Sequence, residues 1–215
     1  MESRQRARLL LADDHTLIAE ACKALLEPEF DVIAIVNDGR AMMHAAVELK
    51  PQVLVVDIAM PLLNGLDAGE QVKHALPDAK LVYLTMNTTP EVAAEAFRRG
   101  ANGYLPKNAA ASELLTAVRE VLKGNSYLSP LIAKDTVEFL LRKKKLHAAP
   151  PAITKRQREV LQLLAEGLSM KEVAYILKLK PGTVAFHKYR IMAALGIKTN
   201  ADLLKYAIKE HMIPE

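Results

Sequence analysis

Short, almost continuous apolar runs alternate with longer amphipathic stretches through the first half of the chain, and this alternation narrows the possible folds more than any other feature. We expect helices near residues 16–27, 39–50, 65–75, 88–99 and 111–123, and strands at residues 7–12, 31–36, 53–57, 80–85 and 103–105. Strands that are apolar on both faces need cover on both sides, and a single helix between successive strands implies parallel pairing. Since crossovers are right-handed, the pattern predicts an α/β fold with a doubly wound, five-stranded parallel sheet in the flavodoxin-like order 2-1-3-4-5.

After residue 124 the alternation stops and only helical periodicity remains. Ser129 and Pro130 predict the start of a helix, and the later prolines Pro150 and Pro151 prevent its continuation, so we place a hinge at residues 147–151. The rest of the chain predicts an all-α four-helix domain. The expected divisions are therefore a first domain at 1–124, a linker with a helix at 125–151 and a second domain at 152–215.

Capping signals separate the four C-terminal helices. The expected boundaries are a capping box of Thr154 with Gln157 and a stop at Gly167, a start at Ser169 for a helix through Leu177, Pro181 in the first turn of a helix that runs to about Leu195 before Gly196, and a cap of Thr199 with Asp202.

The two halves of the chain carry opposite charge. Of the net charge of +4, residues 1–124 contribute −4, with 13 Lys+Arg against 17 Asp+Glu, and residues 125–215 contribute +8, with 16 against 8. A basic second half favours contact with a polyanion, although a solvated basic surface explains the asymmetry equally well. Cys22 is the single cysteine and the apolar runs are too short to cross a bilayer, so we expect no membrane contact and a cytoplasmic location.

Reactive side chains follow four of the predicted strands where each strand ends. Asp13 and Asp14 follow the first strand, Asp57 ends the third, Thr85 ends the fourth and Lys107 follows the fifth. Each has an ordinary explanation alone, such as a helix cap or a solvated lysine, but their joint occurrence favours one crevice at the carboxyl ends of the strands. Three carboxylates repel one another without a cation, and Mg²⁺ prefers oxygen ligands and bridges carboxylates to phosphate oxygens.

These groups, together with the segment DIAMPLLNGL at residues 57–66, resemble the receiver domains of two-component response regulators over roughly residues 7–123. The resemblance implies that Asp57 accepts a phosphoryl group from a histidine kinase. It implies further that Asp14 and Asp57 bind Mg²⁺ directly, with Asp13 acting through water and Ala59 through its backbone carbonyl.

The same resemblance assigns a switch. Lys107 would pair with the phosphoryl oxygens, and Thr85 would turn toward them and let Tyr104 pack inward. The chain departs from the receiver pattern at Pro106, which removes a ladder hydrogen bond, at Met86, which narrows access to the phosphoryl group, and at Asn108, where many receivers carry proline. None of these changes removes a chemical group.

Residues 154–210 resemble the LuxR-type helix-turn-helix domain of NarL/FixJ response regulators, most specifically in the segments 158–174, 183–187 and 195–197. The resemblance implies that helices 169–177 and 182–195 form the motif, with the second in the major groove of double-stranded DNA. Helical spacing places Val184, His187, Ile191 and Leu195 on its buried stripe. The residues expected to face DNA are Lys171, Lys180, Thr183, Ala185, Phe186, Lys188, Tyr189 and Arg190.

Two departures leave the base preference open. Ala185 stands where the family often has a basic residue, and Lys180 replaces the usual Ser or Thr cap before Pro181. Phe186 and Ala185 offer contact to thymine methyl groups, which is modest readout. The last helix, with Leu203, Leu204, Ala207 and Ile208 at helical spacing, forms core and in this family also pairs with its twin.

We therefore interpret the chain as a response regulator, in which phosphorylation controls homodimer formation, domain release or both, and DNA binding regulates transcription. A phosphorylation-independent regulator or protein-interaction module with a degenerate recognition helix is the alternative. An aspartyl-phosphate phosphatase is a third reading, but that class needs an acid two residues after its nucleophile, where Ala59 stands. We expect no enzyme activity beyond phosphotransfer and auto-dephosphorylation.

Overall fold

The computed structural model describes residues 6–86, 88–109, 111–143 and 153–213. In this part of the chain six parallel strands form a sheet in the order β2-β1-β3-β4-β5-β6. The strands are β1 (Arg8–Ala12), β2 (Asp31–Val36), β3 (Val53–Val56), β4 (Lys80–Thr85), β5 (Gly103–Pro106) and β6 (Tyr127–Leu128). The predicted parallel α/β sheet and the order of its first five strands are confirmed, and the predicted number of strands is one too few.

The sequence did not predict β6. This strand pairs in parallel with β5, and just after it the N–H of Ser129 donates to the carbonyl of Tyr104 at 3.0 Å. Two residues are too few to show the alternation by which strands are recognised. β6 therefore covers an edge of β5 that would otherwise be the edge of the sheet.

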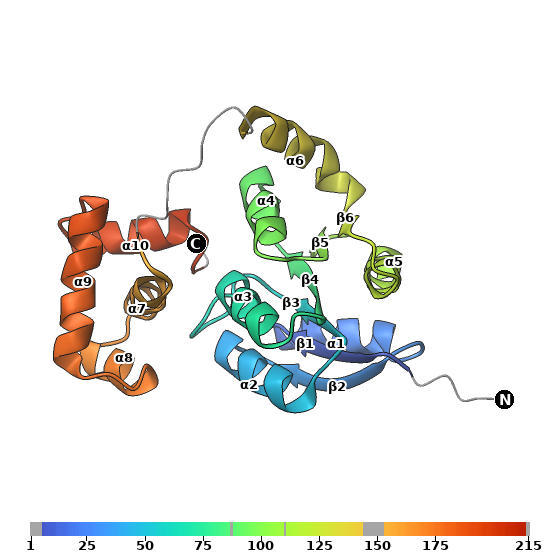
Figure 1. The fold of residues 1–215 in the computed structure, drawn as a ribbon, viewed down its shortest axis with the longest axis horizontal. Coiled ribbons are helices and arrows are strands. Elements are labelled where there is room, and N and C mark those ends of the chain that lie inside the picture. Colours follow the sequence, from blue (N-terminus) through green and yellow to red (C-terminus); the bar gives the residue numbers. More distant parts are fainter. Residues whose placement is uncertain (1–5, 87, 110, 144–152, 214–215) are drawn as a thin grey trace.

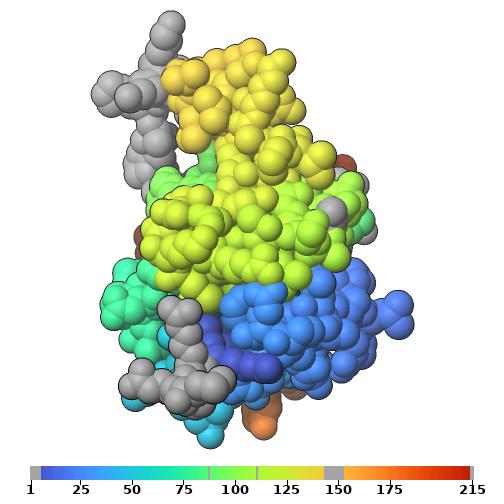
Figure 2. Space-filling view, turned by 90° about the vertical axis from the view of Figure 1, so that its right-hand side faces the viewer, coloured from blue at the N-terminus to red at the C-terminus, as the bar shows by residue number. Residues whose placement is uncertain are grey.

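Five helices cover the two faces of the sheet. They are α1 (Thr16–Leu26), α2 (Gly39–Leu49), α3 (Gly65–Ala75), α4 (Pro90–Arg98) and α5 (Ala111–Leu122). Alternate strand residues enter two cores: Leu10 packs with α2, α3 and α4, while Leu9 and Leu11 pack with α1 and α5. Figure 2 shows α1 and α5 side by side on one face of the sheet.

A sixth helix, α6 (Pro130–Lys143), starts where Ser129 and Pro130 predict it and packs along α4 (Figure 1). Ile132 lies in the core of the α4 face, and the hydroxyl of the buried Thr136 donates to the Ile132 carbonyl at 2.8 Å. The hinge that we expect at residues 147–151 lies outside the described residues.

The C-terminal part is all helical, as predicted. Its helices are α7 (Lys155–Ala165), α8 (Met170–Ile176), α9 (Pro181–Leu195) and α10 (Asn200–Lys209). The capping boxes of Thr154 with Gln157 and Thr199 with Asp202 are confirmed, and Ser169 with Glu172 forms another. α9 ends at Gly196, whose φ of 66° is in the left-handed region that glycine adopts without strain.

The two domains meet through α7. In Figure 1, α7 lies between the sheet domain and α9, so α9 is on the far side of the helical domain. No helix among the described residues is long and apolar enough to span a membrane.

Candidate functional site

The acidic side chains meet at the carboxyl edge of the sheet. The N–H of Asp57, which follows β3, donates to the carbonyl of Ala12 at the end of β1 at 2.8 Å, so the two strand ends are level. Asp13 and Asp57 are buried, with exposed fractions of 7% and 3%. Burial raises the pKa of Asp57 above its ordinary value of 3.8, although the hydrogen bond from Lys107 opposes the rise.

Lys107 joins the two carboxylates. Its Nζ lies 2.7 Å from Oδ2 of Asp57 and 2.8 Å from Oδ2 of Asp13. Burial alone would lower the pKa of Lys107, but the hydrogen bonds to the two carboxylates outweigh it and raise that pKa. Pro106 has no N–H to donate to the neighbouring strand. The next residue supplies a hydrogen bond to β4, because the N–H of Lys107 donates to the Thr85 carbonyl at 2.7 Å.

Asp14 and His15 complete the cluster. Nδ1 of His15 lies 2.8 Å from Oδ1 of Asp14, and one ligand atom from each of Asp13, Asp14, His15 and Asp57 lies within 4.8 Å of the others. The carboxylate oxygens are the hard ligands that Mg²⁺ prefers, so these residues fit the ion. His15 was not predicted as a member of this cluster, although an imidazole directly after paired aspartates was the available signal.

The Ala59 backbone also reaches this cluster. Its N–H donates to Oδ1 of Asp57 at 3.4 Å, and Ala59 lines a cleft of about 290 Å³ together with Asp14. The backbone just after Asp57 therefore contacts the cluster of Asp13, Asp14, His15 and Asp57, which we call the acidic pocket.

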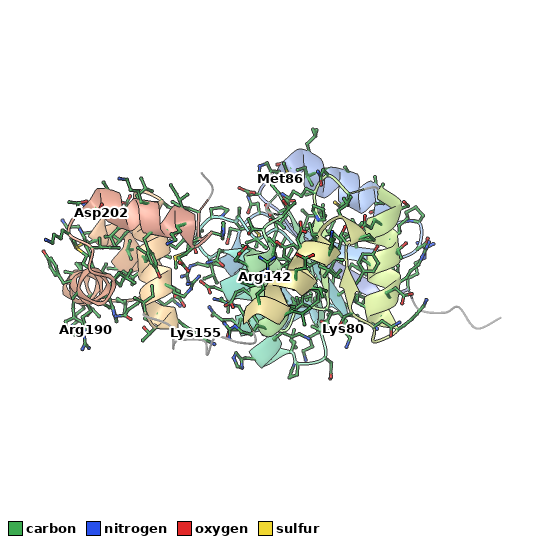
Figure 3. All side chains as sticks on the ribbon, turned by 90° about the horizontal axis from the view of Figure 1, so that it is seen from above. Lys80, Met86, Arg142, Lys155, Arg190 and Asp202 are labelled. Atoms are coloured by element: carbon green, nitrogen blue, oxygen red, sulfur yellow. The ribbon has the colours of Figure 1, made fainter. Side chains whose placement is uncertain are left out.

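The expected switch residues follow or lie on neighbouring strands. Thr85 is buried at the end of β4, and Tyr104 is fully buried on β5. Tyr104 lies in the same core as Ile132 of α6. Met86, labelled in Figure 3, is 73% exposed and does not fill the pocket.

The α9 helix has the predicted buried stripe and outer face. Val184 and Ile191 are buried, His187 and Leu195 are half-buried, and Phe186 and Tyr189 are exposed. The guanidinium of Arg190, which Figure 3 labels in the helical domain, lies 5.4 Å from the centre of the Phe186 ring in a cation–π contact.

Basic side chains surround this face. Lys171 and Lys180 are exposed, while Thr183, Ala185 and Lys188 are partly buried. Lys180 precedes α9 without a side-chain capping bond, as its replacement of Ser or Thr predicts. The exposed Tyr175 of α8, which our sequence analysis did not single out, adds a further aromatic ring to the domain surface.

Ion pairs join α7 to the sheet domain, and the sequence did not predict them. Nε of Arg158 lies 3.2 Å from Oδ2 of the buried Asp67 on α3, and Arg99 pairs with the same carboxylate. Burial alone would raise the pKa of Asp67, but these two guanidinium groups outweigh it and hold that pKa below 3.8. Arg40 pairs with Glu159 at 3.3 Å beside them.

Family comparisons agree with this architecture. The model of the response regulator receiver domain matches residues 9–119, and that of bacterial regulatory proteins of the luxR family matches residues 151–207. The chain is 32% identical over 214 residues to the oxygen regulatory protein NreC of Staphylococcus aureus (strain MRSA252), covering 96% of this chain and 99% of the relative.

Solved structures give the same result. A LuxR-family two-component response regulator from Aurantimonas sp. SI85-9A1 is 30% identical, with a TM-score of 0.61, over 63% of this chain and 99% of that one. The RcsB response regulator of Salmonella typhimurium is 25% identical, with a TM-score of 0.63, over 94% and 96%. The acidic pocket, the helix-turn-helix and these likenesses place the chain in the two-component response regulators of the NarL/FixJ type, whose phosphorylation controls transcription.

Proposed function

We propose that Asp57 is the phosphoacceptor of this regulator and that a histidine kinase is its donor. The observation that carries the proposal is the pairing of the buried Asp57 carboxylate with Lys107 Nζ at 2.7 Å within an acidic cluster. Several carboxylates held this close repel one another more than a single one would repel its surroundings, so the cluster favours a bound cation.

The transfer is a displacement at phosphorus. A carboxylate oxygen of Asp57 attacks the phosphohistidine phosphorus, a P–O bond forms, and the P–N bond breaks. Its electron pair returns to the histidine nitrogen, which takes a proton. Lys107 would pair with the new phosphoryl oxygens, and Thr85 on β4 and Tyr104 on β5 would be the residues that change conformation in response. Auto-dephosphorylation reverses the modification when water attacks the same phosphorus.

Asp13, Asp14, Asp57 and the Ala59 carbonyl are the groups that we propose to hold Mg²⁺. The ion would neutralise charge on the carboxylates and on the phosphoryl oxygens. His15 lies close enough to Asp14 and Asp13 to orient both carboxylates. The ammonium group of Lys107 contributes a positive charge to the same cluster through its contacts with Asp13 and Asp57.

The second half of the proposal is DNA binding by α9. Lys171, Lys180, Lys188 and Arg190 would anchor phosphates, and Thr183, Ala185, Phe186 and Tyr189 would face the base edges. DNA binding as such is supported by a relative, because the response regulator RcsB, 26% identical with a TM-score of 0.58, has been solved in complex with DNA. RcsB has also been solved on the promoter rprA in the presence of the phosphomimetic BeF₃⁻.

We propose in addition that the phosphorylated protein binds DNA as a homodimer. On α10, Leu203 and Ala207 are buried and Leu204 is 41% exposed, which leaves an apolar side chain for a second copy. The proposed domains remain 1–124 and 152–215, with 125–151 as linker.

The experiment treats the full chain with acetyl phosphate and Mg²⁺ and compares it with Asp57→Asn. We expect phosphoryl label on the native chain and none on the variant, and footprints across a genomic library that strengthen with label only in the native chain. Identical footprints would favour the phosphorylation-independent regulator. Binding that does not weaken steeply with salt would contradict the phosphate contacts.

A further inference from the structure

The segment that follows Asp57 is held by a side chain from the other domain. On α7, the Nε2 of Gln162 donates to the Met60 carbonyl at 3.1 Å, and its Oε1 accepts from the N–H of Asn64 at 2.9 Å. The Asn64 amide also donates to this oxygen, at 3.1 Å. Gln162 and Asn64 are each 1% exposed. A buried glutamine with both ends bonded to the same loop fixes the shape of that loop.

The conformation of the loop between Asp57 and Asn64 is costly. Leu62 has a φ of 63°, in the left-handed region that disfavours residues with a side chain, and its side chain packs against the hydrophobic core of the helical domain. Strain of this kind persists only where the surroundings enforce it. The surroundings here are α7 with the core beneath it on one side and the receiver on the other, where the Gly39 N–H donates to the Pro61 carbonyl at 3.4 Å. The helical domain therefore contributes to maintaining the strained loop.

Glu166, one turn after Gln162, brings a negative charge to the same place. Its Oε1 accepts from the N–H of Leu62 at 3.0 Å and from Nε2 of Gln162 at 2.8 Å. Glu166 lines the cleft of about 290 Å³ that Asp14 and Ala59 also line. A carboxylate of the helical domain therefore lines the same cleft as Asp14 of the acidic cluster.

We propose that Gln162 is a positioning residue of the phosphorylation site and that Gln162 with Glu166 forms a latch, which holds the loop 57–64 in its unphosphorylated shape. The proposal rests on phosphorylation of Asp57. Phosphorylation turns the singly charged Asp57 carboxylate into an acyl phosphate, so the site gains roughly one negative charge. Repulsion between this added charge and Glu166 opposes the latched contact. Phosphorylation and latch opening then reinforce each other, because a coupling free energy acts equally in both directions.

The latch does not act by covering the recognition helix. Phe186 and Tyr189 are exposed while Gln162 is bonded, and α9 lies on the far side of the domain (Figure 1). The latch fixes the direction in which α9 points relative to the receiver. When the latch opens, the helical domain can reorient, so that the two α9 helices of a dimer can reach two half-sites.

The test uses Gln162→Met in the full chain, since methionine keeps length and packing but loses every hydrogen bond to the loop. With saturating Mg²⁺, we expect beryllofluoride to bind this variant about tenfold more tightly than the native chain, the effect of losing one to two net hydrogen bonds. Amide hydrogen exchange at Leu62 and Asn64, and the radius of gyration from X-ray scattering, should rise at correspondingly lower beryllofluoride concentrations.

The matched control is Lys155→Met on the same helix. Lys155 contacts Glu70 on α3 at 2.9 Å, is largely exposed and does not touch the loop, so we expect less than a twofold change. Glu166→Gln, which keeps an acceptor for Leu62, should also tighten beryllofluoride binding and answers the question if Gln162→Met does not fold.

Native-like beryllofluoride affinity in Gln162→Met, or domain opening without any change in affinity, would overturn the latch. Failure of the proposed function is recognised separately, because the native chain itself would then take up neither phosphoryl label nor beryllofluoride.

Discussion

The acidic pocket and the outer face of α9 are two polar regions built in opposite ways. In the pocket, the side chains of Asp57 and Lys107 are buried and bonded to each other. On α9, Phe186 and Tyr189 are exposed, and the guanidinium of Arg190 contacts the neighbouring Phe186 ring. The pocket carboxylates are therefore paired with a cation inside the receiver, whereas the outer face of α9 presents its side chains to solvent.

This difference predicts that a pocket substitution costs stability, and Lys107→Met should show the largest effect. Removing the ammonium leaves Asp13 and Asp57 buried together without a cation, so the free energy of unfolding at neutral pH should fall by about 3 kcal/mol or more. Denaturant unfolding without Mg²⁺ measures it.

Mg²⁺ provides the control for that prediction. Added to Lys107→Met, the ion should restore part of the lost stability, because it supplies the missing positive charge to the same carboxylates. An unchanged free energy of unfolding without Mg²⁺ would mean that the pocket carboxylates are well solvated, which would erase the contrast with α9.

The sequence predicted the pocket better than it predicted the surfaces around it. Asp13, Asp57 and Lys107 follow buried strands, and apolar runs mark those strand ends clearly. The partnership of Gln162 with Asn64 joins residues 98 positions apart on two domains, and no local pattern encodes the way in which domains dock. β6 was not predicted for a different reason. Its pairing depends on the edge that β5 offers and not on a pattern in its own two residues.

The close packing of the loop after Asp57 gives the next largest effect. A Cβ on Gly39 of α2 would stand 1.8 Å from the Leu63 carbonyl oxygen, so Gly39→Ala must displace the loop or the helix. We expect a loss of about 1–3 kcal/mol in the free energy of unfolding and weaker beryllofluoride binding. At Gly182, near the start of α9, an added Cβ meets nothing within 4 Å, and Gly182→Ala should not destabilise.

Substitutions on α9 should affect binding and leave folding unchanged. Phe186→Ala should weaken binding to a preferred site by about fivefold, since an apolar contact to thymine methyl groups is worth roughly 1 kcal/mol. Its salt dependence should match that of the native chain. Arg190→Met should instead weaken all DNA sequences alike and reduce the salt slope by about 0.9. Fluorescence anisotropy over a salt series measures both, and a lower unfolding midpoint in either variant would contradict the assignment to a free surface.

The contact between the two domains combines buried side chains, such as Gln162, with exposed ones, such as Lys155. Its pH dependence is the smallest effect that we predict. Burial raises the pKa of Glu166 above its ordinary 4.5, although Gln162, Leu62 and Arg40 oppose the rise and Asp38 adds to it. Docking therefore carries a penalty while Glu166 is charged, and the penalty disappears as the pH falls through the raised pKa. Asp67 behaves oppositely, because a pKa held below 3.8 makes its contribution to docking persist until the pH falls below that value.

The docked arrangement should consequently tighten slightly from neutral pH toward about 4.5 and loosen below 3.8. Hydrogen exchange at Leu62 and Asn64, corrected for the intrinsic pH dependence of exchange, measures the tightening between neutral pH and about 4.5. Glu166→Gln cannot change charge, so this variant should lose the tightening and keep the loosening at lower pH. That result would separate Glu166 from other groups that change charge. If docking in Glu166→Gln tightened with falling pH as it does in the native chain, Glu166 would not be the group responsible. The domain contact would then resemble the buried acidic pocket more than a partly exposed surface.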